Sequence, residues 1–256
     1  MIQRLLTNSL SLVKMKPLSL NECCFIFAKG DMKMPKVTEE YLESKRQMIV
    51  DACYQVCLRK PVGMVTISDV IAETGMSQGA IYRYYNGLDE ILADMSSKIR
   101  ADYNIIEQFE KILTNKDATF EEITYQICDC LGENMEKHLE DIQKINFDFG
   151  VLAINEPERA ANIMAGIKAP GNLDYLGKKA IPMLIEGAYK TGHQPAAKPE
   201  DIGLFISASY SGIEKYCILA NCYGTGDVKV KVEPRKLFKT LADSIILLLG
   251  GNTNVQ

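Results

Sequence analysis

Hydrophobic residues recur at intervals of three and four along most of the chain, which is the spacing of one face of an α-helix. Between residues 39 and 59, for example, Ile49, Cys53 and Val56 share a face, whereas Lys45 and Arg46 lie largely opposite. Similar patterns predict helices over residues 67–74, 78–85, 88 to about 113, about 120–142, 145–154, 157–167, 173–191, 199–221 and 234–249. The pattern therefore predicts an all-α fold.

Several residues mark where these helices begin and end. Thr66 and Ser77 are good N-cap residues in front of two short helices, and Gly75 stands where a helix often ends in a left-handed residue. Pro182 falls inside the 173–191 pattern and should kink or restart that helix. Residues 228–232 alternate as a strand would, but five residues without an evident partner are predicted to form a loop.

The composition is that of an ordinary globular protein. The 256 residues are 47% hydrophobic and 24% charged, with 29 Lys+Arg against 33 Asp+Glu and a net charge of −4. This excludes a disordered chain, and the mild acidity argues against a protein that coats nucleic acid through bulk positive charge. No run reaches the roughly 18 uncharged apolar residues of a membrane span, so no membrane association is predicted.

Residues 1–33 and the eight cysteines shape the expected boundaries and location. The first 33 residues hold only short apolar islands and are expected to be a disordered or non-native extension, with a natural start at Met32 or Met34. The cysteines form no Cys-x-x-Cys pair, so neither a zinc ribbon nor a disulfide framework is predicted. Free thiols are the rule in a reducing compartment, which predicts a cytoplasmic protein in which Cys53 and Cys57 are small core residues.

Residues 66–92 carry the clearest functional signal. Two short helices separated by about three residues, with Gly75 in the turn, predict a helix-turn-helix, whose second helix enters the DNA major groove. Small or hydrogen-bonding residues begin that second helix, and phenol and guanidinium groups follow, suited to phosphates or base edges. The predicted DNA-contacting residues are Thr66, Ser77, Gln78, Gly79, Ala80, Tyr82, Arg83 and Tyr84.

This segment resembles the DNA-binding domain of the TetR family of bacterial transcriptional regulators over about residues 39–95. The shared pattern is a capping Thr, a short helix ending in Gly, then a Ser, a Gly and several aromatic residues before an acidic helix start. It is carried here by Thr66, Gly75, Ser77, Gly79, Tyr82, Tyr84, Tyr85, Asp89 and Glu90. The resemblance implies a DNA-binding domain over residues 34–100, an effector-binding and dimerisation domain over 101–250, and a tail over 251–256.

One position departs from the family pattern. The family commonly has a Lys at the start of its fourth helix as a phosphate contact, and this chain has Leu88 there. Across residues 36–100, eight cations face nine acids, and Arg83 is the one cation of the recognition helix. We therefore expect DNA binding to depend on helix termini, tyrosines and dimerisation more than on net charge. One of Tyr84 and Tyr85 is expected to be a core residue.

The C-terminal two-thirds gives weaker signals. The broad apolar faces of 199–221 and 234–249 suit a two-helix hairpin that doubles into a four-helix bundle, with Phe205, Ile213, Leu241, Ile245 and Leu248 as predicted interface residues. The alternative is that these faces pack only within the chain. An effector pocket between the helices of 104–191 is predicted, with lining residues Phe109, Tyr125, Cys128, Phe149, Met164, Tyr175 and Met183. His138 and His193 lack partners, so neither a metal nor a cofactor is predicted.

The sequence thus favours a homodimeric repressor that binds a palindromic operator in double-stranded DNA and is released by a small apolar or amphipathic effector. A second possibility is a DNA-binding regulator without an inducer, whose C-terminal domain is a protein-interaction module. A third is an α-helical enzyme. Nucleotide-binding and zinc-protease motifs are missing from the sequence, and Gly224-Thr225-Gly226 precedes an alternating stretch, which indicates a turn. The sequence therefore argues against an enzyme.

Overall fold

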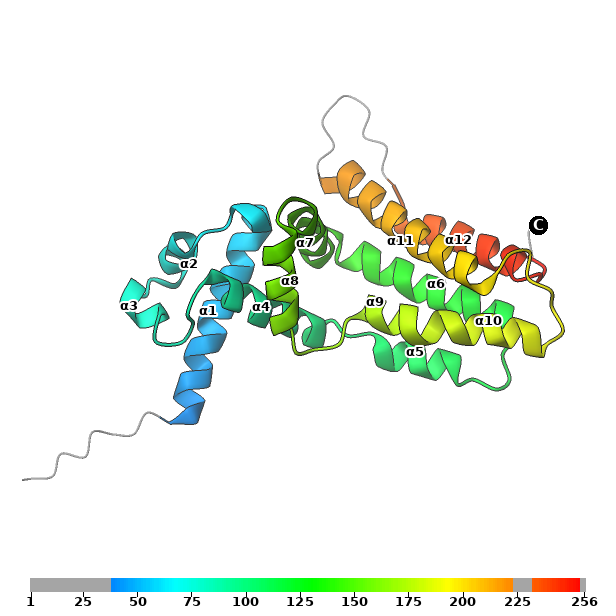
Figure 1. Ribbon diagram of the computed structural model, residues 1–256, viewed down its shortest axis with the longest axis horizontal. Helices are drawn as coiled ribbons and strands as arrows, with labels where there is room; N and C mark the ends of the chain where they lie inside the picture. Colours follow the sequence, from blue (N-terminus) through cyan, green and yellow to red (C-terminus); the bar gives the residue numbers. More distant parts are fainter. Residues whose placement is uncertain (1–37, 223–231, 254–256) are drawn as a thin grey trace, which may run out of the picture. The chain divides into compact units, whose positions relative to one another are not determined.

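The computed structural model describes residues 38–222 and 232–253, and the regular elements in that part of the chain are all helical (Figure 1). The first are α1 (Glu39–Arg59), α2 (Ile67–Thr74), α3 (Gln78–Ile81) and α4 (Leu88–Asp102). They are followed by α5 (Ile106–Leu113), α6 (Phe120–Lys137), α7 (Lys144–Asn155), α8 (Pro157–Gly166), α9 (Asn172–Tyr175), α10 (Ile181–Lys190), α11 (Pro199–Cys222) and α12 (Pro234–Leu248). The prediction of an all-α fold is confirmed.

Helices α1 to α4 share one hydrophobic core with α7 and α8. We call it the N-terminal core; it is built around the buried residues Ile49, Ile81, Ile91, Leu92, Met95, Ile145 and Ile163. Cys53 and Cys57 are fully buried in it, which confirms their prediction as core residues. A hydrogen bond with Cys57, together with burial, raises the pKa of the Cys53 thiol. Cys53 is therefore a protonated, unreactive thiol at neutral pH.

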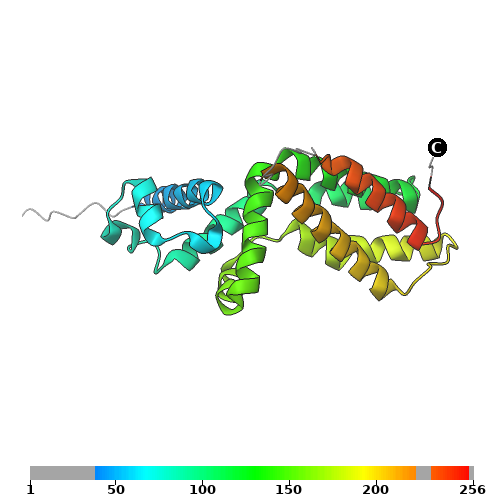
Figure 2. The same ribbon diagram turned by 90° about the horizontal axis from the view of Figure 1, so that it is seen from above.

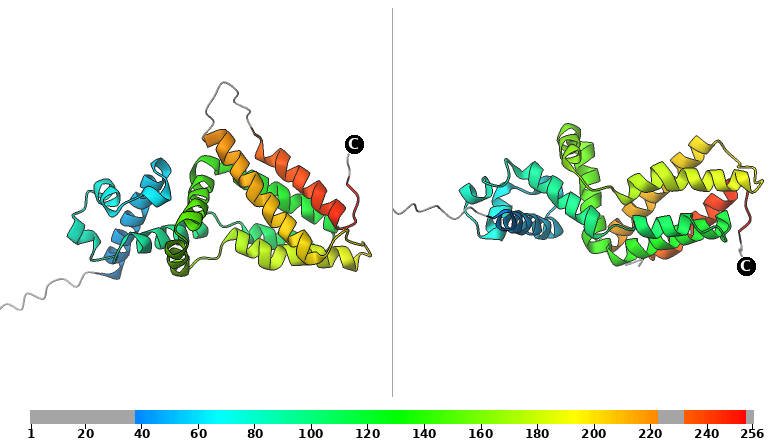
Figure 3. Two further views of the ribbon diagram at one scale, coloured as in Figure 1. Left: turned by 45° about the horizontal axis from the view of Figure 1, so that its top comes forward. Right: turned by 90° about the horizontal axis from the view of Figure 1, so that it is seen from below.

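Helices α5, α6 and α9 to α12 enclose a second core, built around Phe109, Met135, Ile202, Ile218 and Phe238, which we call the C-terminal core. Within it, α12 runs beside α6 (Figure 2), and α11 packs against α12 (Figure 3). A Cβ at Gly132 would lie only 2.9 Å from the Arg235 Cα, so glycine allows this close approach of α6 and α12. Arg235 also donates to both carboxylate oxygens of Asp129, at 2.6 and 2.8 Å.

The helix predicted from 88 to about 113 is interrupted after Asp102, so that prediction is wrong at its centre. The Asn172 side chain accepts from the Ile105 N–H at 3.1 Å and donates to the Tyr103 carbonyl at 3.1 Å. It satisfies the backbone groups that the end of α4 would otherwise leave unpaired. The Asn104 side chain then accepts from the Ile106 N–H at 2.7 Å and starts α5.

Three other predicted helices are shorter or broken. The α3 helix ends at Ile81, and Arg83 and Tyr84 continue in turns whose N–H groups donate to Ala80 and Ile81 carbonyls. π-helical turns at Leu139–Gln143 and Leu176–Ala180 interrupt the predicted helices over 120–142 and 173–191. Pro182 lies in the first turn of α10, which confirms the predicted restart there.

Several predictions fall outside the described residues. These are the extension over 1–33, the turn at 224–226, and all but the last residue of the 228–232 loop; Val232 is described and is buried.

Candidate functional site

Thr66 starts α2 through reciprocal hydrogen bonds with Asp69. The Thr66 Oγ1 accepts from the Asp69 N–H at 3.3 Å, and the Asp69 carboxylate accepts from the Thr66 N–H at 2.8 Å. Lys60 pairs with the same carboxylate at 2.7 Å, and the hydrogen bonds from Lys60 and Thr66 lower the pKa of Asp69 to about 2. Thr66 therefore positions the first helix of the pair, with its backbone N–H already engaged within the chain.

The turn between α2 and α3 has the geometry that the sequence predicts. Gly75 adopts a φ of +65°, the left-handed conformation that favours glycine, and its N–H donates to the Ile71 carbonyl at 3.1 Å. The Ser77 Oγ then accepts from the Ala80 N–H at 3.3 Å and caps α3. Local capping chemistry thus fixes where the second helix of the pair begins.

The outer face of α3 is open and nearly featureless. Ser77, Gln78 and Gly79 are exposed, and a Cβ built at Gly79 would meet no atom of the described chain within 4 Å. Tyr82 is 46% exposed, and Arg83 is exposed with no ion pair to any described residue. This face can approach a flat or grooved partner closely, and it offers an amide, a phenol and a guanidinium group.

Two of the predicted DNA-contacting residues are less accessible. Ala80 is half-buried, and Tyr84 is half-buried against the N-terminal core. Tyr85 is 3% exposed and donates to the Asp94 carboxylate at 3.0 Å, which confirms that one of the two tyrosines is a core residue. Tyr82 and Arg83 are therefore the better candidates for contacts beyond the chain.

Most other cations near the helix pair are neutralised within the chain. Arg59 pairs with Glu73, and Lys60 pairs with Asp69. Arg46 lies 3.8 Å from an oxygen of Asp94 and over the ring of Tyr85. The helix pair is therefore not a strongly basic patch, and its contacts depend on shape and on a few exposed side chains.

Helix α8 and the segment after it hold α4 in place. Arg159 donates to Asp89 in the first turn of α4 at 2.9 Å, and the Lys168 N–H donates to the Ser97 hydroxyl at 3.0 Å. A Cβ at Gly166 would lie 2.9 Å from the Ala93 Cβ, so the two helices are in close contact there.

Helix α7 makes a second connection, to the end of α1 and to the segment that follows it. Lys144 donates to the Leu58 carbonyl at 3.0 Å. Asp148 is 6% exposed, and burial raises the pKa of its carboxyl although it accepts a hydrogen bond from the Val62 N–H. Helices α7 and α8 therefore contact the chain on both sides of the helix pair.

The C-terminal core contains a cavity of about 150 Å³ between α6, α10, α11 and α12. Its walls are mostly aliphatic, with a few hydroxyl groups and one thiol. The lining residues are Thr124, Ile127, Cys128, Leu131, Leu173, Leu176, Ala180, Ile181, Leu184, Ile206, Ser207, Tyr210, Ser211, Leu241 and Ile245.

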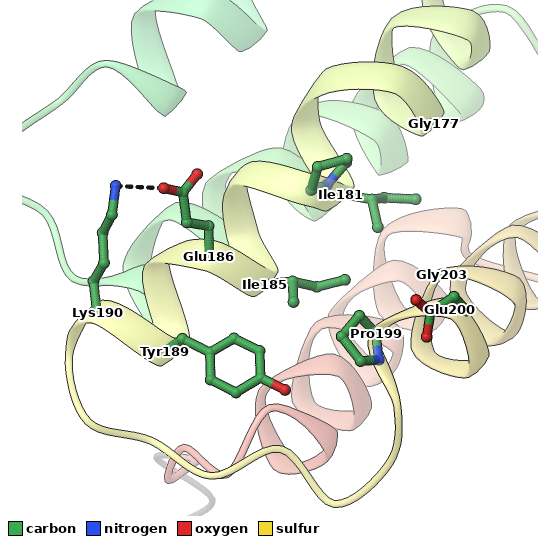
Figure 4. A pocket seen from close by; sticks show the side chains of 10 residues that line it. Gly177, Ile181, Ile185, Glu186, Tyr189, Lys190, Pro199, Glu200 and Gly203 are labelled. Carbon is green, nitrogen blue, oxygen red and sulfur yellow. Dashed lines mark ion pairs between the residues drawn. The ribbon is translucent and has the colours of Figure 1, made fainter.

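A wider groove of about 670 Å³ lies between α10 and α11 on the outside of the same helices (Figure 4). Ile185, Tyr189 and Pro199 form its apolar walls, and a Glu186–Lys190 ion pair of 2.6 Å lies at its edge. Ile181 lines both the groove and the cavity. The groove and the cavity therefore adjoin at this side chain.

Comparison with known proteins identifies the fold. The sequence matches no family model. A Bacillus subtilis protein, the uncharacterised HTH-type transcriptional regulator YfiR, is 26% identical over 128 residues, which are 49% of this chain and 59% of that protein. The chain thus matches less than two thirds of this relative.

Solved structures align over most of the chain. The fatty acid degradation regulator FadR of Bacillus halodurans superposes with a TM-score of 0.58 at 17% identity, covering 81% of this chain and 95% of that chain. TetR-family regulators from Rhodococcus sp. and Mesorhizobium loti have TM-scores of 0.54 and 0.56 at 11% and 12% identity. They cover 80% of this chain, and 99% and 96% of theirs. The chain has the fold of TetR-family transcriptional regulators. The resemblance seen in residues 39–95 is confirmed.

Within this TetR fold, the predicted effector-pocket residues do not converge on one site. Cys128 lines the cavity, whereas Phe109 is fully buried and stacks on Tyr175 at 6.2 Å between ring centroids. Tyr125 donates to Asp243, and Met183 packs against the C-terminal core. These five residues share a core with the cavity, but of the five only Cys128 lines it.

Phe149 and Met164 lie on α7 and α8 and do not line the cavity of the C-terminal core. Phe149 packs against the N-terminal core, and Met164 is 49% exposed, with its sulfur near the Arg100 guanidinium. Both lie on the helices that hold the helix pair, because α7 and α8 pack toward α1 and α4. The sequence pattern could not show which core each of these helices joins.

The predicted dimer residues need a similar correction. Leu241 and Ile245 are 6% and 3% exposed and line the internal cavity, so they are unavailable to a second chain. Ile213 and Leu248 are half-buried, and Phe205 is 43% exposed. Other large apolar residues do reach the surface of α11 and α12, although the sequence did not predict them as interface residues; they are Leu204, Tyr216, Leu219 and Leu247.

Two further features concern the described residues only. No group of three or more His, Cys, Asp or Glu side chains among them could hold a metal ion. None of the described helices is both long and apolar enough to cross a membrane.

Proposed function

We propose that this chain is a sequence-specific, DNA-binding transcriptional regulator that acts as a homodimer and is released from its operator by a small ligand. The exposed surface of α3 and of the turn after it carries the proposal, because Gln78 and Gly79 on α3 and Tyr82 and Arg83 in that turn are all exposed. The fold and the regulator relatives support a binding protein rather than an enzyme.

The homodimer is supported by the outer face of α11. Leu204 is 70% exposed, Tyr216 56% and Leu219 52%, which is a large apolar area for the surface of a single chain. Pairing of this face across a two-fold axis would place two copies of α3 toward two half-sites, about 34 Å apart in successive major grooves.

Ligand release is supported by the cavity and by the way the helix pair is held. The cavity lies in the C-terminal core; α7 contacts α11 of that core and also α1, and α8 contacts α7 and α4. A structural neighbour, the Thermus thermophilus repressor FadR, was solved with lauroyl-CoA, at a TM-score of 0.51 and 13% identity. A ligand that prefers one arrangement of the helices would shift the spacing of the two recognition helices, and DNA would weaken ligand binding equally.

The direct test is selection of duplexes from a random DNA library by the full chain. We expect enrichment of a palindrome, because a two-fold dimer presents α3 twice. Arg83→Ala should lower affinity for the enriched sequence by about 1–3 kcal/mol if it reads a base, whereas Lys111→Ala on α5 should change it little. Failure to enrich any sequence would contradict the proposal, and equal loss on random DNA would assign Arg83 to phosphates.

A charge on α11 should separate the two protomers. Leu204→Glu is expected to raise the dimer dissociation constant at least roughly tenfold, because it would bury an unpaired carboxylate in an apolar contact. Light scattering coupled to size-exclusion chromatography measures the mass. Ile154→Glu is the control, since Ile154 is 76% exposed on α7 and carries the same change. Equal dimerisation of both variants would place the interface elsewhere.

The second possibility, a regulator without an inducer, predicts the same DNA binding but no occupant for the cavity. Binding of a small ligand in the cavity would distinguish the two.

A further inference from the structure

The cavity in the C-terminal core is lined by uncharged side chains. Among the described residues that line it there is no Asp, Glu, Lys, Arg or His. Cys128 is the sole thiol of that lining, and burial raises its pKa to about 12. Burial likewise raises the pKa of the Tyr210 phenol. At neutral pH the lining of the cavity is therefore entirely uncharged.

Two acids act electrostatically on polar groups of this lining. Asp243 accepts a hydrogen bond from Tyr125 and acts electrostatically on Cys128. Glu214 lies one helical turn beyond Tyr210 on α11 and acts electrostatically on its phenol. Burial raises the pKa of Glu214 to about 7. An anion in the cavity would thus lose its hydration without meeting an opposite charge among the lining residues.

The hydroxyl groups of the lining have distinct hydrogen-bonding capacities. The Thr124 hydroxyl is fully buried and donates its hydrogen to the Phe120 carbonyl at 2.7 Å. The Ser207 hydroxyl donates to the Gly203 carbonyl at 2.9 Å. Each oxygen keeps lone pairs that can accept from a ligand, because a hydroxyl has one donor and two acceptor positions. The Tyr210 phenol adds a donor.

The size of the cavity limits the ligand further. At about 150 Å³ it matches an engineered apolar cavity of roughly the same volume that stays dry and takes up benzene. Aliphatic side chains from four helices form most of the wall. A long acyl chain or a nucleotide moiety is larger than this volume and could not lie wholly inside the cavity.

We propose that the effector is an uncharged hydrophobic molecule about the size of one six-membered ring, carrying a hydroxyl group that bonds to Thr124 and Tyr210. This inference rests on the proposed function, since it names the ligand of the proposed regulatory site. It also separates this chain from a regulator of acyl-CoA, because neither the volume nor the charge of the cavity suits that ligand.

A matched series of ring compounds tests the inference. Ligand-observed NMR titration of the full chain at pH 7 would compare benzyl alcohol, toluene, benzoate and benzylamine, which share a ring and differ in one substituent. We expect benzyl alcohol to bind most tightly, toluene a few-fold more weakly, and the two ions at least roughly tenfold more weakly. Benzoate or benzylamine binding as tightly as benzyl alcohol would overturn the inference, as would displacement of benzyl alcohol by lauroyl-CoA at equal concentration.

Two variants locate the ligand. Ala180→Leu fills the cavity from α10's side and should abolish binding of both neutral compounds. Thr124→Val removes the hydroxyl at similar size and should weaken benzyl alcohol several-fold while leaving toluene unchanged. If Ala180→Leu does not fold, the Thr124 comparison alone decides. Unchanged benzyl alcohol binding in either folded variant would contradict the proposed contacts.

The DNA selection and the ligand titration test the regulator and the ligand class independently. An enriched operator without binding of any neutral ring compound would contradict the ligand class alone. Binding of benzyl alcohol by a chain that enriches no DNA would contradict the regulator and leave the ligand class standing.

Discussion

Gly79→Glu is expected to reduce affinity for the operator by at least roughly 100-fold while the protein remains folded. A Cβ at Gly79 meets nothing within 4 Å among the described atoms, so the fold has room for the side chain. Gly79 lies in the first turn of α3, where a carboxylate interacts favourably with the helix dipole. The new charge would face the DNA backbone, and like charges across an interface cost several kcal/mol.

Gly150→Glu is the matched control for this variant. Gly150 is an exposed glycine of α7, a Cβ there also meets nothing within 4 Å, and the change in net charge is identical. Fluorescence anisotropy with the enriched duplex measures affinity, and thermal denaturation measures folding. Equal affinity of the two variants would show that α3 does not approach DNA, whatever else the chain binds.

The helix pair could be predicted from the sequence because the residues that cap its helices lie close together in the chain. Thr66, Asp69, Gly75 and Ser77 lie within twelve residues and fix two helix starts and a turn through hydrogen bonds to near neighbours. Such capping signals can be read directly from the sequence, because they need no distant partner. The helix pair was therefore predicted to within a few residues, although α3 proved shorter.

The interruption at 103–105 could not be predicted in the same way. It depends on Asn172, which is 67 residues away from Ile105 in sequence and reaches both sides of the break. The hydrophobic pattern continues from α4 into α5, so periodicity alone favours one long helix. Only the tertiary contact shows where the helix ends.

Where the predicted effector and dimer residues lie could not be foreseen for a related reason. Helix α12 is apolar on more than one side, so its sequence does not show which leucines face α6 and which face outward. Leu241 and Ile245 face the cavity, whereas Leu247 is 56% exposed. Which face a helix buries is decided by its neighbours, and the close α6–α12 contact at Gly132 makes that choice here.

Ile163→Ala should lower the free energy of unfolding more than any other substitution proposed here outside the ligand cavity. Ile163 is 1% exposed on α8 and belongs to the N-terminal core, at the contact between α8 and α4. Truncation of a fully buried isoleucine removes apolar contacts and leaves a void, which lowers the free energy of unfolding by about 2–4 kcal/mol. Urea denaturation monitored by circular dichroism would measure the shift in midpoint.

Ile154→Ala provides the control, because Ile154 is 76% exposed on α7 and loses the same atoms. We expect its unfolding free energy to change by less than about 0.5 kcal/mol. Because the cavity lies in the C-terminal core, both variants should bind benzyl alcohol as the parent chain does under native conditions. Equal stability of the two variants would mean that α8 does not anchor α4, and the proposed route from ligand to recognition helix would then lack its central contact.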